Sequence, residues 1–434
     1  MRAGRPKLTA INLLLFSFSL GIALLAAEFV LHHTGGFGAT IGPKLFCEYD
    51  PVLGWRKIPG KEGWLEKKGE YRVFEKINSK GLRGPEYPYK KPAGEFRILV
   101  LGDSFVEGYF ISLEDLFLQR LEDALNARGD GRRYRVINGG TGAYSTDQEL
   151  LFFQNEGRKY EPDMVLLVVC YNDIWYNTQD RYSSSRDSWF KPLFRLDGDR
   201  LVLTNVPLPR AKPAPVRSER KLTVKQWLNN NSIIYHFVRK KLKRISWLND
   251  AAIWMGLAQD DARSETFDRK ADGLETASVP SHLRVFQNPS SPQMEKAWEI
   301  TESLLSELKQ QVETAGARLM VLYAPIKGRI QHDARAEAMK REYGLADLDK
   351  PGKDLALLCK KLSLPYIDPT DRLRDEMKRT GERQYYERDG HWNVRGNETV
   401  AKVLFEYIES NILGDRKTTR APVAGPDKRI GDSE

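Results

Sequence analysis

The stretch Arg97-Ile98-Leu99-Val100-Leu101-Gly102-Asp103-Ser104 decides the fold of this chain, because an apolar run leads at once into a glycine, an acid and a serine. Residues 96–101 are too few for a helix but suit a strand buried on both faces of a sheet. Residues 113–128 then carry apolar side chains at helical spacing and predict an amphipathic helix. Such a strand-to-helix turn lies at the carboxyl edge of an α/β sheet, where ligands bind. By itself the turn could simply end a strand, so a role for Ser104 depends on other segments.

The alternation of strand and helix continues along the chain. Further strands are predicted over residues 134–138, 164–170, 318–324 and 365–367, and further helices over residues 146–159, 292–315, 333–343, 351–362 and 394–411. Apolar strands separated by amphipathic helices favour a parallel sheet covered on both faces. The predicted fold is therefore α/β, a flavodoxin-like three-layer sandwich with a mostly parallel five-stranded sheet, formed by residues 96–412.

Three other regions flank or interrupt this predicted domain. Residues 34–95 are rich in Gly, Pro and Trp and are predicted to connect to the core and pack on it. Residues 176–290 are predicted as a helical insertion. A basic helix predicted over 222–247 could bind an anionic surface or simply expose its charged face to solvent. The polar tail over residues 413–434 is predicted to be disordered.

The N-terminal segment has the length and composition of a membrane anchor. Residues 8–27 hold no charge, and a helix of this length spans the hydrocarbon core of about 30 Å. Basic residues precede it, which keeps residues 1–7 in the cytoplasm: Arg2, Arg5 and Lys7. We therefore expect a transmembrane signal anchor over residues 8–31 and an extracytoplasmic domain, periplasmic or at the cell surface. A cleaved signal peptide is the alternative, because Leu25-Ala26-Ala27 offers small residues near a cleavage position.

Composition sets limits on the partners. With 41% hydrophobic and 29% charged residues the chain is globular, and its net charge of +9 is too small an excess to indicate nucleic acid. The three cysteines are too few and scattered for a zinc site or a disulfide framework, although a single bridge remains open: Cys47, Cys170 and Cys359. No metal and no cofactor are predicted.

Two later strands also end in residues that suit a catalytic site. The run Ile137-Asn138-Gly139-Gly140-Thr141-Gly142 ends one strand, and its glycines allow the backbone to approach a ligand, although such glycines often only make a turn. Tyr171-Asn172-Asp173 ends the next strand. The Asn172 amide could stabilise an oxyanion without titrating, or could cap the strand as an Asx turn.

The fourth segment is Asp389-Gly390-His391-Trp392-Asn393, just before the last predicted helix. A serine hydroxyl needs a base to remove its proton, and the imidazole that acts as base needs an orienting acceptor. His391 and Asp389 could supply both for Ser104. All four segments lie where strand ends converge on one edge of a doubly wound sheet.

In the order and spacing of these four blocks the chain resembles the GDSL-like, or SGNH, hydrolase superfamily. The resemblance implies that Ser104 is the nucleophile, that the Ser104 N–H, Gly140 and Asn172 form the oxyanion hole, and that Asp389 and His391 complete the triad. Two departures stand out: Cys170 replaces a frequent glycine of the third block, and Arg388 takes the place three residues before His391 where the family often has its Asp. The Asp-x-His-Trp form resembles membrane-associated members, including relatives that O-acetylate bacterial exopolysaccharides.

The expected activity follows from this resemblance. We expect an extracytoplasmic serine hydrolase that cleaves carbohydrate O-acyl or other carboxylic esters, with an acylated small molecule or a polysaccharide as partner. An O-acetyltransferase acting on an envelope polysaccharide or exopolysaccharide would use the same residues. A non-catalytic, glycan-binding envelope protein is the alternative from another class. The sequence predicts neither the acyl chain nor the oligomeric state.

Overall fold

The computed structural model describes residues 46–210, 279–331 and 343–414, apart from residues 68, 185, 186 and 346, together with part of the stretch 12–27. Its centre is a five-stranded sheet, in the order β13-β12-β7-β5-β6, in which every pairing is parallel. The strands are β5 (Glu95–Leu101), β6 (Arg133–Asn138), β7 (Met164–Cys170), β12 (Arg318–Ala324) and β13 (Tyr366–Ile367). Because the first of these strands in the chain lies between the second and the third, the order is that of flavodoxin-like folds. The predicted α/β class and parallel five-stranded sheet are confirmed.

The central strands are buried on both faces. In β5, Ile98 and Val100 pack into the core on one face, and Leu99 and Leu101 pack into the core on the other, as the two-residue period of a strand requires. The register sets Leu101 of β5 beside Leu167 of β7, and β6 runs parallel on the other side of β5. The segments that follow these three strands therefore leave the sheet at the same edge.

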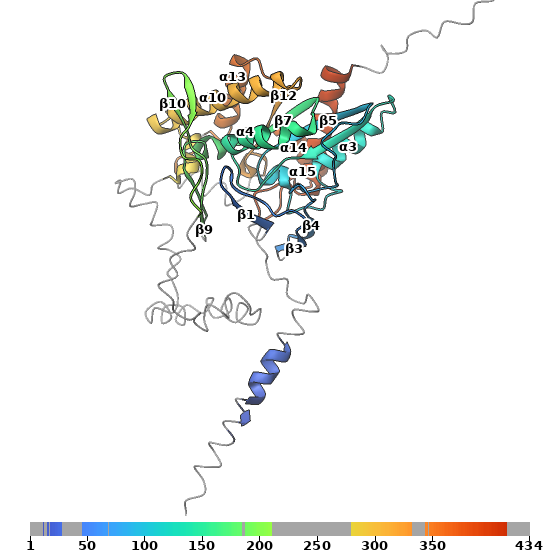
Figure 1. The fold of residues 1–434 in the computed structure, drawn as a ribbon, viewed down its shortest axis with the longest axis vertical. Coiled ribbons are helices and arrows are strands. Elements are labelled where there is room, and N and C mark those ends of the chain that lie inside the picture. Colours follow the sequence, from blue (N-terminus) through green and yellow to red (C-terminus); the bar gives the residue numbers. More distant parts are fainter. Residues whose placement is uncertain are drawn as a thin grey trace, which may run out of the picture.

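Helices cover both faces of the sheet and give three layers. One face holds α3 (Phe117–Asn126), α14 (Thr370–Thr380) and α15 (Val394–Ile408). The other holds α4 (Thr146–Asn155), α10 (Pro292–Thr314) and α13 (Lys350–Lys361). In Figure 1, α13 lies above strands β12 and β7, α10 lies beside β12, and α15 lies below. Short helical turns complete this part of the chain: α2 (Ser104–Glu107), η2 (Gly157–Tyr160), α5 (Asp173–Tyr176), η3 (Ser281–Phe286), α11 (Lys327–Ile330) and η4 (Glu409–Leu413).

The region predicted to connect and pack, residues 34–95, contains two antiparallel hairpins from residue 47 to residue 76. They pair β1 (Cys47–Asp50) with β2 (Gly54–Lys57), and β3 (Glu62–Lys67) with β4 (Tyr71–Lys76). In the second hairpin Leu65 and Val73 are buried. Figure 1 places both hairpins at the lower side of the sheet, below α15.

The insertion predicted to be helical is different where the structure describes it. Four short strands between residues 181 and 203 pair antiparallel, β8 (Arg181–Ser184) with β9 (Asp187–Phe190), and β10 (Phe194–Asp197) with β11 (Arg200–Leu203). Strands form here instead of a helix because the aromatic residues of these short segments pack against the first hairpin. Trp189, for example, contacts Trp55 at 6.0 Å between ring centroids. The helix predicted over 222–247 and most of the one over 333–343 lie outside the described residues.

The ends of the chain are described only in part. In the portion of the chain that the structure covers, no helix has both the length and the apolar character to cross a membrane. The anchor predicted over residues 8–31 falls partly on residues outside this portion, and residues 1–7 and 415–434 lie outside it altogether.

Candidate active site

Ser104 is the first residue of α2, directly after β5. The side chain of Asp103 caps this single turn by accepting a hydrogen bond from the Phe105 N–H at 2.9 Å. Gly102 allows the tight connection, because a Cβ at that position would lie 2.5 Å from Cγ2 of Val106. The local sequence thus holds the serine at the carboxyl edge of the sheet.

The structure brings Ser104, His391 and Asp389 together, although Ser104 and His391 are 287 residues apart in the chain. The Ser104 Oγ lies 2.7 Å from Nε2 of His391, and Nδ1 of the same ring is hydrogen-bonded to Oδ1 of Asp389. The backbone N–H of His391 donates to that same carboxylate oxygen at 3.1 Å. A carboxylate only two residues before the histidine therefore does reach its ring.

The electrostatics of Asp389 fix the direction of these hydrogen bonds. Burial opposes ionisation of this carboxyl, but hydrogen bonds from His391 and Lys67 outweigh it and hold the pKa of Asp389 well below its ordinary value. An ionised carboxylate only accepts hydrogen bonds, so Nδ1 of His391 carries the ring proton. Nε2 is then the acceptor for the Ser104 hydroxyl, which is the geometry of a general base beside its nucleophile.

Aromatic rings hold the imidazole of His391 in this orientation. Phe110, itself buried, stacks on it with 4.2 Å between ring centroids and 23° between ring planes. Phe105 and Tyr109 contact it at 4.9 Å and 5.7 Å between centroids. Three packed rings leave the imidazole little rotational freedom.

Two residues of the β3–β4 hairpin also hold Asp389, and no sequence motif pointed to them. Lys67 Nζ lies 2.9 Å from Oδ2 of Asp389 and 2.9 Å from Oε2 of Glu70. Oε1 of Glu70 accepts hydrogen bonds from the backbone N–H groups of Arg388 and Asp389, the latter at 3.2 Å. Lys67 lies 322 residues before Asp389 in the chain, so only the folded hairpin reveals this contact.

The glycine loop after β6 lies against α2. A Cβ on Gly140 would come within 2.5 Å of the Glu107 backbone nitrogen, so only glycine fits there. A Cβ on Gly142 would lie 4.0 Å from Cβ of Ser104, which puts this loop beside Ser104. The Gly140 N–H donates to Oδ1 of Asn138 at 3.0 Å. The amide predicted as an oxyanion donor is therefore bonded within its own loop in this structure.

A buried ion network under the loop fixes its position. Glu107, at the end of α2, accepts hydrogen bonds from the Gly142 N–H and from Lys57 Nζ, and Lys57 also pairs with Glu75 at 3.2 Å. Trp55 Nε1 donates to the carbonyl of Gly142 at 3.1 Å. Burial raises the pKa of Glu75 to about 7, although the charge of Lys57 opposes that rise. The only sequence signal of this network is a charged residue three positions after Ser104 in an otherwise apolar turn.

Asn172 follows β7, the neighbour of β5. Its half-buried side chain makes no capping hydrogen bond on α5, and Asp173 supplies the local bond instead, accepting from the Cys170 N–H at 2.7 Å. Cys170, which replaces the frequent glycine of the family, is buried and hydrogen-bonds through its thiol to Asp103. The departure at Cys170 therefore links the ends of β7 and β5.

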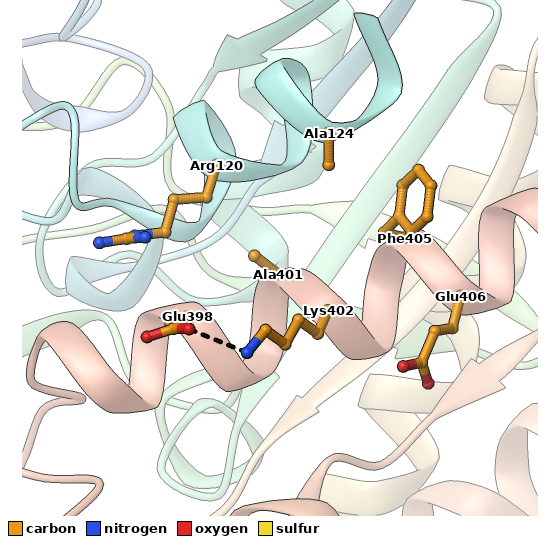
Figure 2. A pocket seen from close by; sticks show the side chains of 7 residues that line it. All are labelled: Arg120, Ala124, Glu398, Ala401, Lys402, Phe405 and Glu406. Carbon is orange, nitrogen blue, oxygen red and sulfur yellow. Dashed lines mark hydrogen bonds and ion pairs between the residues drawn. The ribbon is translucent and has the colours of Figure 1, made fainter. Parts of the chain in front are cut away.

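Figure 2 shows a groove between α3 and α15 with a volume of about 250 Å³. Its charged residues pair within the protein, as Lys402 does with Glu398 at 2.8 Å. None of the predicted site residues lines it. We therefore place the candidate active site at Ser104 and not in this groove. Among the residues that the structure describes, no group of three or more His, Cys, Asp or Glu side chains is arranged to hold a metal ion.

Comparison with known proteins adds a family match. Residues 286–432 match the sequence model of the SGNH hydrolase-like domain of the acetyltransferase AlgX. No curated protein matches the chain. Similar solved structures include the α/β hydrolase LAE5 from the metagenome of Lake Arreo, Spain, at 12% identity over 73% of this chain and 96% of that one, with a TM-score of 0.36.

Two acetylxylan esterases are similar at the same level. The acetyl xylan esterase AlAXEase has 11% identity over 72% of this chain and 100% of that one, with a TM-score of 0.36. An acetylxylan esterase from Geobacillus stearothermophilus has 10% identity over 72% of this chain and 94% of that one, with a TM-score of 0.35.

The matched segment contains Asp389 and His391, and the structure adds Ser104 to them from the other end of the domain. The match over residues 286–432 supports the resemblance to SGNH hydrolases that the four sequence blocks predicted. The matched model is that of a domain of an acetyltransferase, within the class of SGNH-type esterases and acetyltransferases.

Proposed function

We propose that this protein transfers acyl groups from esters through a Ser104-His391-Asp389 triad and an acyl-enzyme on Ser104. The observation that carries the proposal is the 2.7 Å contact between Ser104 Oγ and His391 Nε2, with Asp389 bound to the other ring nitrogen. Activation of a serine requires a base within hydrogen-bond reach and a third group that orients the base. All three are present in that relation.

In the proposed reaction, His391 Nε2 takes the proton of Ser104 as its Oγ attacks the ester carbonyl. Asp389 holds the resulting imidazolium in place. The Ser104 N–H and the Asn172 amide bind the oxyanion, and the Gly140 N–H joins them once it exchanges its bond to Asn138 for the substrate. His391 then gives its proton to the leaving alcohol. An incoming hydroxyl, activated by the same base, finally removes the acyl group from Ser104.

The two activities within this class differ only in that last acceptor. Water gives an esterase, and a sugar hydroxyl gives an O-acetyltransferase. The match of residues 286–432 to a domain of an acetyltransferase favours the second, with a polysaccharide as acceptor. The triad geometry serves both equally.

The test supplies purified protein with a chromogenic acetyl ester, with and without a polysaccharide acceptor. Acetylated polysaccharide identifies a transferase, and release of acetate alone identifies an esterase. A fluorophosphonate probe should label the wild type and not Ser104→Ala. If the folded wild type binds glycan, is not labelled and turns over no ester, the catalytic proposal is wrong and the glycan-binding alternative stands.

We also propose that residues 8–31 anchor the protein in a membrane, with the catalytic domain outside the cytoplasm. The uncharged run of residues 8–27 and the basic residues before it support this topology. Alkaline extraction of membranes should leave the protein in the pellet, and external protease should degrade the domain. Recovery in the soluble fraction with a new N-terminus near Ala27 would show a cleaved signal peptide instead.

A further inference from the structure

We propose that Lys67 is a positioning residue for the triad, so that the β3–β4 hairpin forms part of the active site. Lys67 acts through Asp389 and does not touch the reacting atoms. The proposal rests on the proposed function, because it assigns a role within the Ser104-His391-Asp389 mechanism. The new element is that catalysis also requires Lys67, which lies outside the residues that match the family model.

The hairpin holds Asp389 by both its side chain and its backbone. Lys67 Nζ contacts the carboxylate oxygen that His391 does not use, at 2.9 Å. Glu70 orients the Lys67 ammonium at 2.9 Å and accepts a hydrogen bond from the Asp389 N–H at 3.2 Å. The side chains of Glu70 and Asp389 are only 3% and 13% exposed, while that of Lys67 is 34% exposed, so solvent screens the two carboxylates weakly and the ammonium more strongly.

The loop that carries Asp389 needs such an external support. Gly390 separates Asp389 from His391, and a Cβ built on this glycine would meet no atom within 4 Å. The loop is therefore not packed at that point. Within it, His391 holds the Asp389 carboxylate only through Oδ1, by its ring and its backbone N–H, so that Oδ2 would be free to move without a further partner. The charge-assisted bond from Lys67 removes this freedom, because it fixes the second carboxylate oxygen while the first accepts from His391.

The hairpin is itself rigidly attached to the rings that pack on the imidazole. Tyr71, which pairs with Lys67 across the hairpin, contacts Phe110 at 6.5 Å and Tyr386 at 5.5 Å between ring centroids. Phe110 is the ring that stacks on His391. The support of Asp389 and the support of His391 thus come from one packed cluster.

The experiment compares Lys67→Met with Lys67→Arg and with Lys76→Met as the matched control. Lys76 lies on the same hairpin, is exposed, and forms no ion pair with any residue that the structure describes. For each protein we would measure kcat and KM on a chromogenic acetyl ester, the rate of fluorophosphonate labelling, and the melting temperature.

We expect Lys67→Met to lower both kcat and the labelling rate about tenfold, in line with the loss of one partly exposed charge-assisted hydrogen bond, with KM unchanged. Lys67→Arg should keep most of the wild-type rate, and Lys76→Met all of it. Equal labelling rates for the wild type and Lys67→Met would overturn the proposal. So would a loss in Lys67→Met that Lys67→Arg shares in full while both melt at the wild-type temperature.

The failure of this proposal and that of the proposed function give different results. If the wild type is not labelled at all, the proposed function fails. If the wild type is labelled and Lys67→Met reacts equally fast, only the role of Lys67 fails. Should Lys67→Met melt well below the wild type, Glu70→Gln takes its place, and unchanged kcat and labelling in Glu70→Gln would then refute the positioning role of the hairpin.

Discussion

Replacement of Lys57 by methionine tests the buried network that joins β2 to the glycine loop. Lys57 is paired with Glu75 and Glu107, and all three side chains are at most 1% exposed. Methionine fills most of the same space but leaves two carboxylates buried without their cation. Breaking a buried ion pair in this way costs about 3–5 kcal/mol.

This cost converts to a shift in melting temperature. For the roughly 290 residues of the domain that the structure describes, the entropy of unfolding is about 0.6 kcal/mol/K, so the loss of about 3–5 kcal/mol corresponds to a decrease of about 5–8 °C. Catalysis should suffer as well, because Glu107 also accepts from the Gly142 N–H beside Ser104. Calorimetry and the acetyl-ester assay on the same samples measure both effects.

The control is Lys61→Met, an exposed lysine in the turn between the two hairpins, which should melt with the wild type. The double variant Lys57→Met/Glu75→Gln should recover part of the loss, because it removes one of the two carboxyl groups that pair with Lys57. A Lys57→Met protein that melts within about 1 °C of the wild type would refute the reasoning, since it would show that the buried carboxylates do not depend on their cation.

Three further predictions concern the triad, the oxyanion site and pH. Asp389→Asn should lower kcat by about 10⁴-fold, because asparagine does not hold the required tautomer of His391; unchanged steady-state kinetics would contradict the triad. Asn172→Ala should lower kcat by about 10²–10³-fold with the labelling site intact, and a change in KM alone would argue against an oxyanion donor. Glu75 has a pKa of about 7 in the folded protein against an ordinary 4.5, so it binds a proton on folding; its contribution to stability is complete below pH 4.5 and is lost as the pH rises through about 7. Urea titrations at pH 5 and pH 8 should show a smaller loss of stability in Glu75→Gln than in the wild type, and an equal loss would contradict the raised pKa of Glu75.

The parts of the fold that the sequence predicted are those with strong apolar patterns. The strands at residues 164–170 and 318–324 have the predicted bounds, because each is a near-continuous apolar run between polar or turn residues. The helix predicted from residue 292 begins there, after the N-cap Ser291. Helix α14 was not predicted, because Leu373 is its only buried apolar residue and the rest of its surface is polar. The N-terminal hairpins were missed because their strands are short and half exposed.

The same distinction holds for the site. Ser104, Asp389 and His391 lie in segments with a recognisable order along the chain, and the structure brings them together. Lys67 and Lys57 belong to no motif. Each contacts a residue far away in the chain, Asp389 for Lys67 and Glu107 for Lys57, so neither contact can be seen before the hairpins are folded. The sequence shows which residues carry reactive groups. The residues that hold those groups in place are identified only in the folded structure.

The thiol of Cys170, which hydrogen-bonds to Asp103, can be used to measure how often the ends of β5 and β7 separate. Cys170 is 2% exposed and lies where the ends of β5 and β7 meet. Burial is the main cause that raises the pKa of its thiol, so alkylating reagents do not meet a reactive thiolate in the folded state. When the two strand ends separate, the thiol gains solvent and its ordinary reactivity. The rate at which iodoacetamide modifies Cys170, measured by peptide mass spectrometry, therefore reports how often the sheet edge that carries Ser104 opens.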